Sequence, residues 1–177
     1  MIKQDISENQ VKFIYLGIGS NLGNKRNNIE KTKFKLDQNN IKILQSSSFY
    51  ESLSWPNPNN PKFLNIVLKI TTSLSPIDLL KICKQIEISL GRKKRSKNSP
   101  RECDIDIIDF NGLVKNNTQL KLPHPRSHSR NFVLYPIKEI DPKWVHPVFK
   151  KNVDFLINEL SQNSRIEITR LRKSVII

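Results

Sequence analysis

Cysteine is scarce in this sequence, and long apolar runs are missing from it. The chain has two cysteines, Cys83 and Cys103, which are too few for a disulfide framework or a zinc site. No segment approaches the apolar length needed to span a bilayer, and residues 1–12 lack the apolar core of a signal peptide. We therefore expect reduced thiols in a cytoplasmic protein that does not bind membranes.

Internal repeats, an interdomain linker and the common nucleic-acid-binding motifs are also missing. A chain of 177 residues is most simply a single domain, here residues 1–177, with residues 1–11 and about 152–177 as peripheral extensions. The net charge of +14, from 30 Lys and Arg against 16 Asp and Glu, raises the hypothesis of a nucleic-acid partner. Because the charge is spread along the whole chain, we expect no nucleic acid.

Residues 101–110 have the period-2 alternation of a strand with two different faces. Residues two apart on a strand project from one face, so Asp104 and Asp106 form a close carboxylate pair. Two like charges repel unless a cation or a proton lies between them, and Mg²⁺ suits such a pair. Strict alternation places Asp109 on the opposite face. The alternative interpretation is an exposed polar strand face without a ligand.

A strongly basic loop precedes this strand. Carboxylates for a metal beside Arg and Lys for phosphate oxygens are the groups that phosphoryl transfer needs. A solvated, flexible loop is the alternative for the basic run taken alone. The loop reads Gly91-Arg92-Lys93-Lys94-Arg95-Ser96-Lys97-Asn98-Ser99-Pro100-Arg101.

Hydrophobic periodicity predicts a βαββαβ order, which folds as a ferredoxin-like α+β sandwich with an antiparallel sheet. Ser75 and Pro76 are typical of the start of the second helix. Additional elements follow towards the C-terminus. The expected strands are residues 11–18, 41–50, 63–72 and 102–110, the helices are residues 25–38 and 76–90, and the additions are a strand at 120–122, a helix at 153–160 and an edge strand at 166–171.

The loop formed by residues 51–62 is rich in proline and asparagine, which keep it out of regular structure. A long loop inside a compact domain is often functional, for example as a lid. Its Trp55 could equally be a hydrophobic plug that pins the loop.

Five motifs lie in register along the chain. They are Gly19-Ser20-Asn21-Leu22-Gly23, Phe63-Leu64-Asn65, Glu87-x3-Gly91-Arg92, Pro100-Arg101-x2-Asp104-Ile105-Asp106 and Pro123-His124-Pro125-Arg126-x-His128-x-Arg130-x-Phe132. Together they resemble the motifs of the 6-hydroxymethyl-7,8-dihydropterin pyrophosphokinase family, and the likeness runs from about Phe13 to Pro147. That family makes a folate precursor by transferring the terminal diphosphate of ATP to the pterin hydroxymethyl group, which releases AMP. The resemblance implies the same fold and reaction, and the family precedent is a monomer.

The resemblance also implies a role for each matching residue. Asp104 and Asp106 resemble the ligands of two Mg²⁺ ions that bridge ATP to the pterin hydroxyl. Phe63 and Phe132 resemble the aromatic pair that sandwiches the pterin ring, and Asn65 the amide that pairs with its edge. The remaining matches are Ser52 and Leu53 for backbone contacts to pterin, Arg92 and Arg101 for phosphates, Glu87, His124 and Arg130 for the ATP side, and Ile107 for adenine.

Two rival interpretations stay open at this point. A two-metal nuclease or nucleotidyltransferase would also use paired aspartates, but it needs a further acidic ligand. A basic RNA-binding module needs exposed aromatic residues on its central strands, and Phe13 and Tyr15 have the required parity. Ser99 departs from the family, which usually has glycine there, and no dedicated general base is evident.

Overall fold

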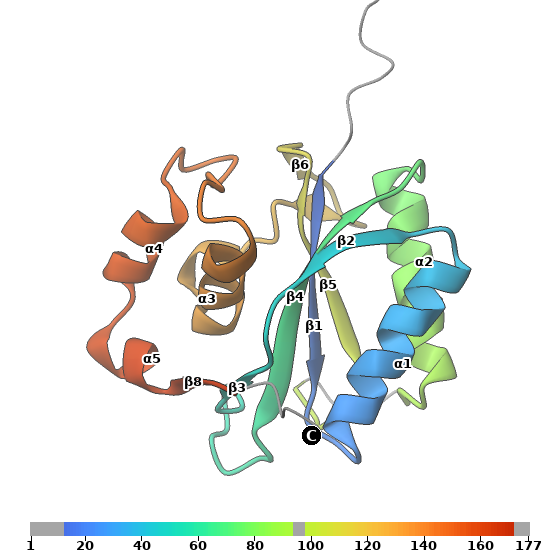
Figure 1. Cartoon of the computed structure of the whole chain (residues 1–177), viewed down its shortest axis with the longest axis horizontal. Coiled ribbons are helices and arrows are strands. Elements are labelled where there is room, and N and C mark those ends of the chain that lie inside the picture. Colours follow the sequence, from blue (N-terminus) through green and yellow to red (C-terminus); the bar gives the residue numbers. More distant parts are fainter. Residues whose placement is uncertain (1–12, 94–97, 172–177) are drawn as a thin grey trace, which may run out of the picture.

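The computed structural model describes residues 13–93 and 98–171. It has the expected βαββαβ order, with the second strand divided into two, followed by smaller elements (Figure 1). The core elements are β1 (Ile14–Ser20), α1 (Lys25–Gln38), β2 (Lys42–Ser46), β3 (Tyr50–Ser52), β4 (Phe63–Thr71), α2 (Pro76–Ser89) and β5 (Asp104–Phe110). Then come β6 (Lys115–Asn116), β7 (Lys121–Leu122), the 3₁₀ turn η1 (Ser127–Ser129), α3 (Asn131–Ile140), α4 (Val153–Glu159), α5 (Gln162–Ile166) and β8 (Ile168–Arg170).

The main sheet is antiparallel and has the strand order β5-β1-β4-β3-β8, with β2 also paired to β4. This arrangement confirms the predicted ferredoxin-like α+β fold. β1 lies inside the sheet, between β5 and β4, and it is mostly apolar, with Ile14, Leu16 and Ile18 on one face and Tyr15 on the other. A strand that is buried on both faces reads as a continuous apolar run.

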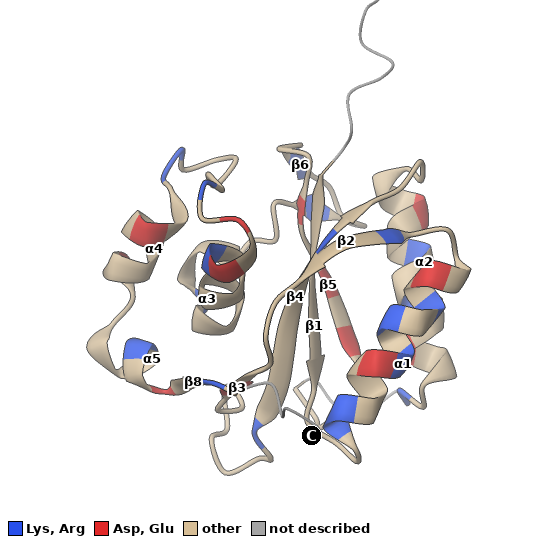
Figure 2. Ribbon diagram, viewed as in Figure 1, with Lys and Arg blue, Asp and Glu red and all other residues tan. Residues whose placement is uncertain are grey.

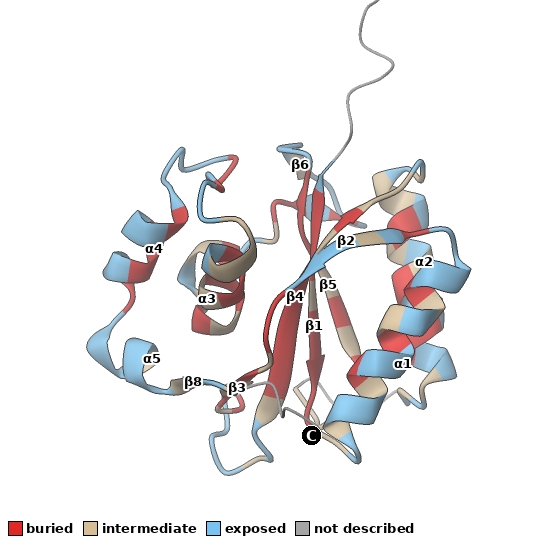
Figure 3. Cartoon of the chain, in the orientation of Figure 1, coloured by how far each residue is buried: buried red, intermediate tan, exposed pale blue. Residues whose placement is uncertain are grey.

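Helices cover both faces of the sheet (Figures 1 and 3). α1 and α2 pack over the larger cluster, which includes Leu36 and Leu79, while α3 and α4 pack over the smaller cluster with Val67, Ile108 and Trp144. Both cysteines are buried and free, as expected from their scarcity. Tyr15 is only 5% exposed beneath this second layer, so the aromatic platform that an RNA-binding module needs is not open at that position.

One sequence prediction about this core is wrong. Residues 41–50 form no single strand, because β2 ends at Ser46 and β3 begins at Tyr50. The hydroxyl of Ser47 accepts a hydrogen bond from Val67 N (3.0 Å) and donates to Ser48 O (2.8 Å), so a side chain satisfies backbone groups where the ladder is interrupted.

The C-terminal elements are attached to the same sheet. β8 pairs antiparallel with β3, which confirms an edge strand within residues 166–171. α4 confirms the helix expected at residues 153–160. Residues 1–12, 94–97 and 172–177 lie outside the description, and with them the N-terminal extension and the centre of the basic loop.

Candidate functional site

The register between β1 and β5 places the two carboxylates next to two glycines. Gly17 pairs with Asp106 and Gly19 pairs with Asp104, so all four residues face the same side of the sheet. Since the glycines have no side chains, a cavity of about 570 Å³ opens above them, and Asp104 and Asp106 line it. The red bands of β5 in Figure 2 mark this acidic strand.

Three arginines contact the carboxylate pair. Arg92 Nη1 lies 2.7 Å from Asp104 Oδ1, and Arg101 Nη2 lies 2.8 Å from Asp104 Oδ2. Arg130 Nη1 lies 3.3 Å from Asp106 Oδ2. These cations offset the repulsion between the two carboxylates, and guanidinium groups are also good partners for phosphate oxygens.

A second cavity, of about 260 Å³, adjoins the carboxylates on the side of the arginines. We call this region the phosphate end. Its position, directly beside Asp104 and Asp106, is where the oxygens of a polyphosphate would meet both the cations and a metal held by the carboxylates. The phosphate end consists of Arg92, Arg101, His124, Arg126 and Arg130.

Glu87 forms an ion pair with Arg92 and lines neither of the two cavities. It is 2% exposed, its Oε2 lies 2.6 Å from Arg92 Nη1, and its Oε1 accepts a hydrogen bond from Ile105 N (2.7 Å). Burial raises the pKa of the Glu87 carboxyl, although the neighbouring Lys84, the Ile105 amide and Arg92 oppose that shift. The side chain therefore connects α2 with β5 and orients the guanidinium group of Arg92.

His124 and Arg130 reach Asp106 from the segment that follows β7. The His124 amide donates to Ile108 O (2.8 Å), which ties this segment to β5. His124 Nε2 lies 3.7 Å from Asp106 Oδ2, and burial lowers the pKa of His124, with Asp106 acting against that shift. Of the three residues predicted for the ATP side, His124 and Arg130 thus lie at the phosphate end, and Glu87 contacts it through Arg92.

The other part of the first cavity contains the residues expected to contact a ring, and we call it the ring end. Asn65 Nδ2 donates to Ser52 Oγ (2.9 Å), while its Oδ1 lies beside Gly19, only 3.0 Å from the place that a β-carbon would take there. The guanidinium groups of Arg101 and Arg130 lie over Phe63 and Phe132, 5.4 and 5.3 Å from the ring centroids. The ring end consists of Ser52, Leu53, Phe63, Asn65 and Phe132, all of which line the cavity.

Ile107, expected to contact adenine, does not lie with the other predicted site residues. It is 4% exposed and belongs to the core cluster under α1 and α2, on the opposite face from Asp104 and Asp106. Its side chain lines neither cavity among the described residues.

The prediction that Asp109 lies on the opposite face is wrong. The register between β1 and β5 shifts between Tyr15 and Leu16. Ile107 pairs with Leu16 and Asp109 pairs with Tyr15, so Asp109 lies on the same face as Asp106. There Asp109 accepts hydrogen bonds from Trp144 Nε1 (2.8 Å) and Gly112 N (2.9 Å), and burial raises the pKa of its carboxyl. The described residues contain no cluster of three potential metal ligands, so the further acid of a two-metal nuclease is not found there.

Sequence reasoning missed several residues that shape the site. Gly17 and Gly19 form its floor, and the alternation Gly-x-Gly inside an apolar strand was the available signal. Asn21 connects Arg101 with the 51–62 loop: its Oδ1 accepts from Arg101 N (2.8 Å), and its Nδ2 donates to Pro61 O (3.1 Å). Arg126 lines both cavities, although the resemblance to the family implied no role for it.

Trp55 is 66% exposed, so it is not the plug that one interpretation proposed. Its ring lies at the mouth of the larger cavity, with the guanidinium carbon of Arg126 5.1 Å from the ring centroid. The 51–62 loop and the segment after β7 therefore meet across the cavity, which agrees with the alternative of a loop that covers the site. Within residues 13–93 and 98–171, no helix has the length and apolarity to cross a membrane.

Comparisons with known proteins agree with this geometry. A model of the 7,8-dihydro-6-hydroxymethylpterin-pyrophosphokinase family matches residues 15–142. The 2-amino-4-hydroxy-6-hydroxymethyldihydropteridine pyrophosphokinase of Aquifex aeolicus is 44% identical over 138 residues, which cover 78% of this chain and 86% of that protein. The folic acid synthesis protein FOL1 of Dictyostelium discoideum is 43% identical over 136 residues, 76% of this chain and only 20% of that protein.

A solved structure with the same fold is the HPPK-DHPS of Plasmodium falciparum, with a TM-score of 0.71 and 15% sequence identity. The match covers 93% of this chain and 47% of that one, so this chain spans about half of the larger protein. At that identity the likeness shows the fold alone, whereas the family model and the relative from Aquifex aeolicus carry the assignment. The chain therefore belongs to the 7,8-dihydro-6-hydroxymethylpterin-pyrophosphokinase family, and it is a pyrophosphoryl-transferring enzyme of folate biosynthesis.

Proposed function

We propose that this chain transfers the terminal diphosphate of ATP to the hydroxymethyl group of 6-hydroxymethyl-7,8-dihydropterin. The observation that carries the proposal is the position of the Asp104–Asp106 pair between the arginines of the phosphate end and the aromatic residues of the ring end. A site with these two ends suits one substrate with a polyphosphate and another with a flat ring.

The ring end fits a pterin by its chemistry. Phe63 and Phe132 offer faces for stacking, and the Oδ1 of Asn65 accepts a hydrogen bond from a donor on the ring edge. Ser52 and Leu53 add backbone groups beside that edge. A buried polar set of this kind discriminates against ring analogues that leave it unpaired.

The residues also fit magnesium, which the reaction of this family implies. Asp104 and Asp106 are 20% and 37% exposed in their side chains, share one face and border the phosphate end. Mg²⁺ in nucleotide sites takes one or two carboxylates and completes its octahedron with water and phosphate oxygens, so two aspartates suffice. We infer that they hold two ions. Bound Mg²⁺ supplies positive charge to the polyphosphate and lowers the pKa of a neighbouring hydroxyl.

The transfer is an in-line displacement at the β-phosphorus. The bond from the pterin hydroxyl oxygen to that phosphorus forms, the bond to the oxygen shared with the α-phosphate breaks, and AMP leaves with that oxygen. Arg92, Arg101 and Arg130 neutralise the phosphate charge and orient the chain of phosphates. The hydroxyl proton passes to solvent. The cytoplasmic location and the monomeric state expected from the sequence stay predictions.

The test is AMP formation from ATP and Mg²⁺, with and without 6-hydroxymethyl-7,8-dihydropterin. We expect pterin-dependent AMP, and a loss of at least about a hundredfold in the Asp104→Ala/Asp106→Ala variant, because groups that stabilise a charged transition state are worth that much. Asp37→Ala/Glu159→Ala, which removes two exposed acids outside both cavities, is the matched control and retains activity. Folded wild-type protein that forms no pterin-dependent AMP would refute the proposal.

A further inference from the structure

The C-terminal segment, residues 161–171, contains α5 and β8 and is attached to β3, the strand that leads into the ring end. Tyr50 pairs with Arg170 and Ser52 pairs with Ile168 across the two strands. The amide of Leu171 adds a hydrogen bond to Phe49 O (2.8 Å). This pairing occupies the outer edge of β3, and so the backbone beside Ser52 is held from both sides, by β4 and by β8.

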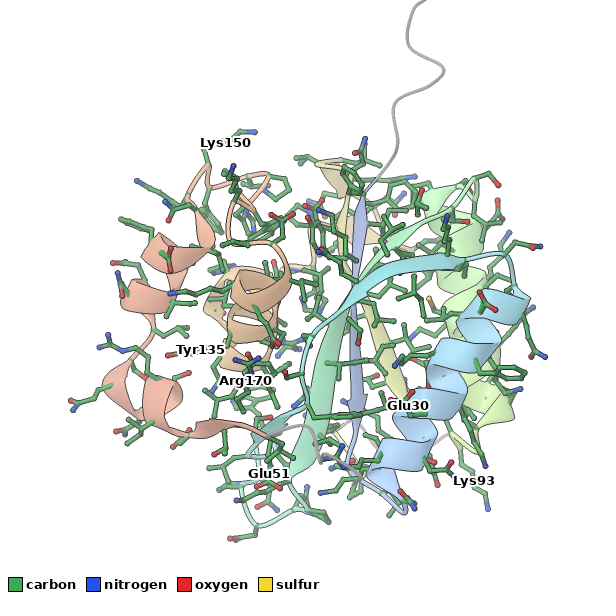
Figure 4. All side chains as sticks on the ribbon, viewed as in Figure 1. Glu30, Glu51, Lys93, Tyr135, Lys150 and Arg170 are labelled. Atoms are coloured by element: carbon green, nitrogen blue, oxygen red, sulfur yellow. The ribbon has the colours of Figure 1, made fainter. Side chains whose placement is uncertain are left out.

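Arg170 fastens this segment to α3 as well. Its Nη2 donates to Glu139 Oε1 (2.7 Å), and its Nε and Nη2 lie 3.2 and 3.1 Å from Ser48 Oγ. The Glu139 carboxylate also accepts from Ser48 N (3.1 Å) and from Tyr50 Oη (2.9 Å). In Figure 4, Arg170 is labelled where the C-terminal segment comes close to α3. One ionic cluster thus joins β8, β3 and α3.

A second connection lies at the start of α3. Asn131 Nδ2 donates to Ser164 O (2.6 Å) on α5, and Asn131 directly precedes Phe132. Ser164 and Glu167 line the same cavity as the residues of the ring end. The C-terminal segment therefore forms part of the wall at this end of the cavity, instead of lying apart from it.

We propose that the C-terminal segment contributes Ser164 and Glu167 to the ring end and that Arg170 is a positioning residue for the pterin substrate. The proposal rests on the proposed function. Ser52 and Leu53 come from β3 and its end, whereas Phe132 comes from α3, so the ring must fit between walls on separate elements. Stacking and backbone hydrogen bonds both require a fixed spacing, and Arg170 with Glu139 fixes these two elements relative to each other.

The experiment measures kcat and both KM values for Arg170→Ala, with Arg165→Ala as the control. Arg165 is an exposed arginine on α5, so the control removes the same charge from the same segment. We expect the KM for the pterin to rise about tenfold in Arg170→Ala, the scale of a lost charge-assisted hydrogen bond, with the KM for ATP unchanged. Arg170→Lys, which keeps the charge opposite Glu139, restores part of the pterin affinity.

A direct binding measurement separates positioning from catalysis. Calorimetric titration of the pterin into enzyme saturated with Mg²⁺ and α,β-methylene-ATP, in which the bond to be broken is blocked, gives the pterin affinity alone. We expect the same tenfold loss there. If circular dichroism shows that Arg170→Ala does not fold, Ser48→Ala is measured in its place, because it removes the hydroxyl that Arg170 contacts and keeps the ion pair with Glu139.

The outcomes distinguish the two proposals. Wild-type protein without pterin-dependent AMP overturns the proposed function and this inference together. Active wild type, with an Arg170→Ala variant that matches Arg165→Ala in pterin KM and affinity, overturns the inference alone. Equal rises in both KM values also overturn it, because they indicate a general loss of structure.

Discussion

Gly19 has no side chain at a point where a β-carbon would lie 3.0 Å from Asn65 Oδ1 and 3.3 Å from Phe63 Cδ1. Both neighbours belong to the ring end, and their positions leave no room for a methyl group without movement. We expect Gly19→Ala to raise the KM for the pterin by roughly tenfold, since small displacements of binding groups are costly, and to leave the KM for ATP unchanged. Steady-state kinetics with each substrate varied in turn checks this.

Gly17→Ala is the matched control for that variant. A β-carbon there would lie 3.2 Å from Ile108 Cδ1, which does not belong to the ring end, so we expect a smaller effect on the KM for the pterin. Equal pterin KM values in the two variants would contradict the argument.

Single residues also mark the limit of the sequence prediction. The spacing of Asp104 and Asp106 was enough to predict that their side chains lie together, because residues two apart on a strand share a face. The same rule failed for Asp109, since the register shift opposite Tyr15 depends on how two distant strands pair. Ile107 follows the alternation of faces along β5, and its side chain therefore lies in the core.

Among the elements, helix α2 supports the phosphate end through a residue in its last turn. Ser75 caps the N-terminus by accepting a hydrogen bond from Asp78 N (3.2 Å), and the far end of the helix carries Glu87, which holds Arg92. The start of α2 could be predicted from the sequence, because an N-cap serine followed by proline is a local signal.

We expect Ser75→Ala to lower the free energy of unfolding by about 1 kcal/mol, the usual cost of losing an N-cap. Both KM values are expected to stay at the wild-type level, because the last turn of α2 keeps its contacts with β5. Urea denaturation measures the stability. Ser73→Ala, at an exposed serine just upstream, is the control, and an equal loss of stability in both variants would refute the capping argument.

At the scale of the whole molecule, the net charge of +14 is the dominant electrostatic feature. Self-repulsion of a strongly charged chain destabilises the compact state, and salt screens it. We expect the thermal midpoint to rise with NaCl concentration. In Lys31→Glu/Lys121→Glu, whose two exposed lysines lie outside both cavities, the net charge falls by four and the salt dependence becomes weaker.

Differential scanning calorimetry over a range of NaCl concentrations makes this comparison. A midpoint that falls with salt, or an equal slope in the charge-reduced variant, would show that self-repulsion does not govern the stability. The variant tests the sum of the charges, because neither lysine contacts the carboxylate pair.

The order of the elements, the carboxylate pair, the arginines of the basic loop and the family could all be predicted from the sequence. These depend on local periodicity, on capping residues and on motifs that stay contiguous in the chain. Three features followed from the folded chain instead: the face that Asp109 occupies, the cavity above Gly17 and Gly19, and the contact of residues 161–171 with the ring end. Those features arise from contacts between residues far apart in the sequence, where no local pattern specifies the pairing.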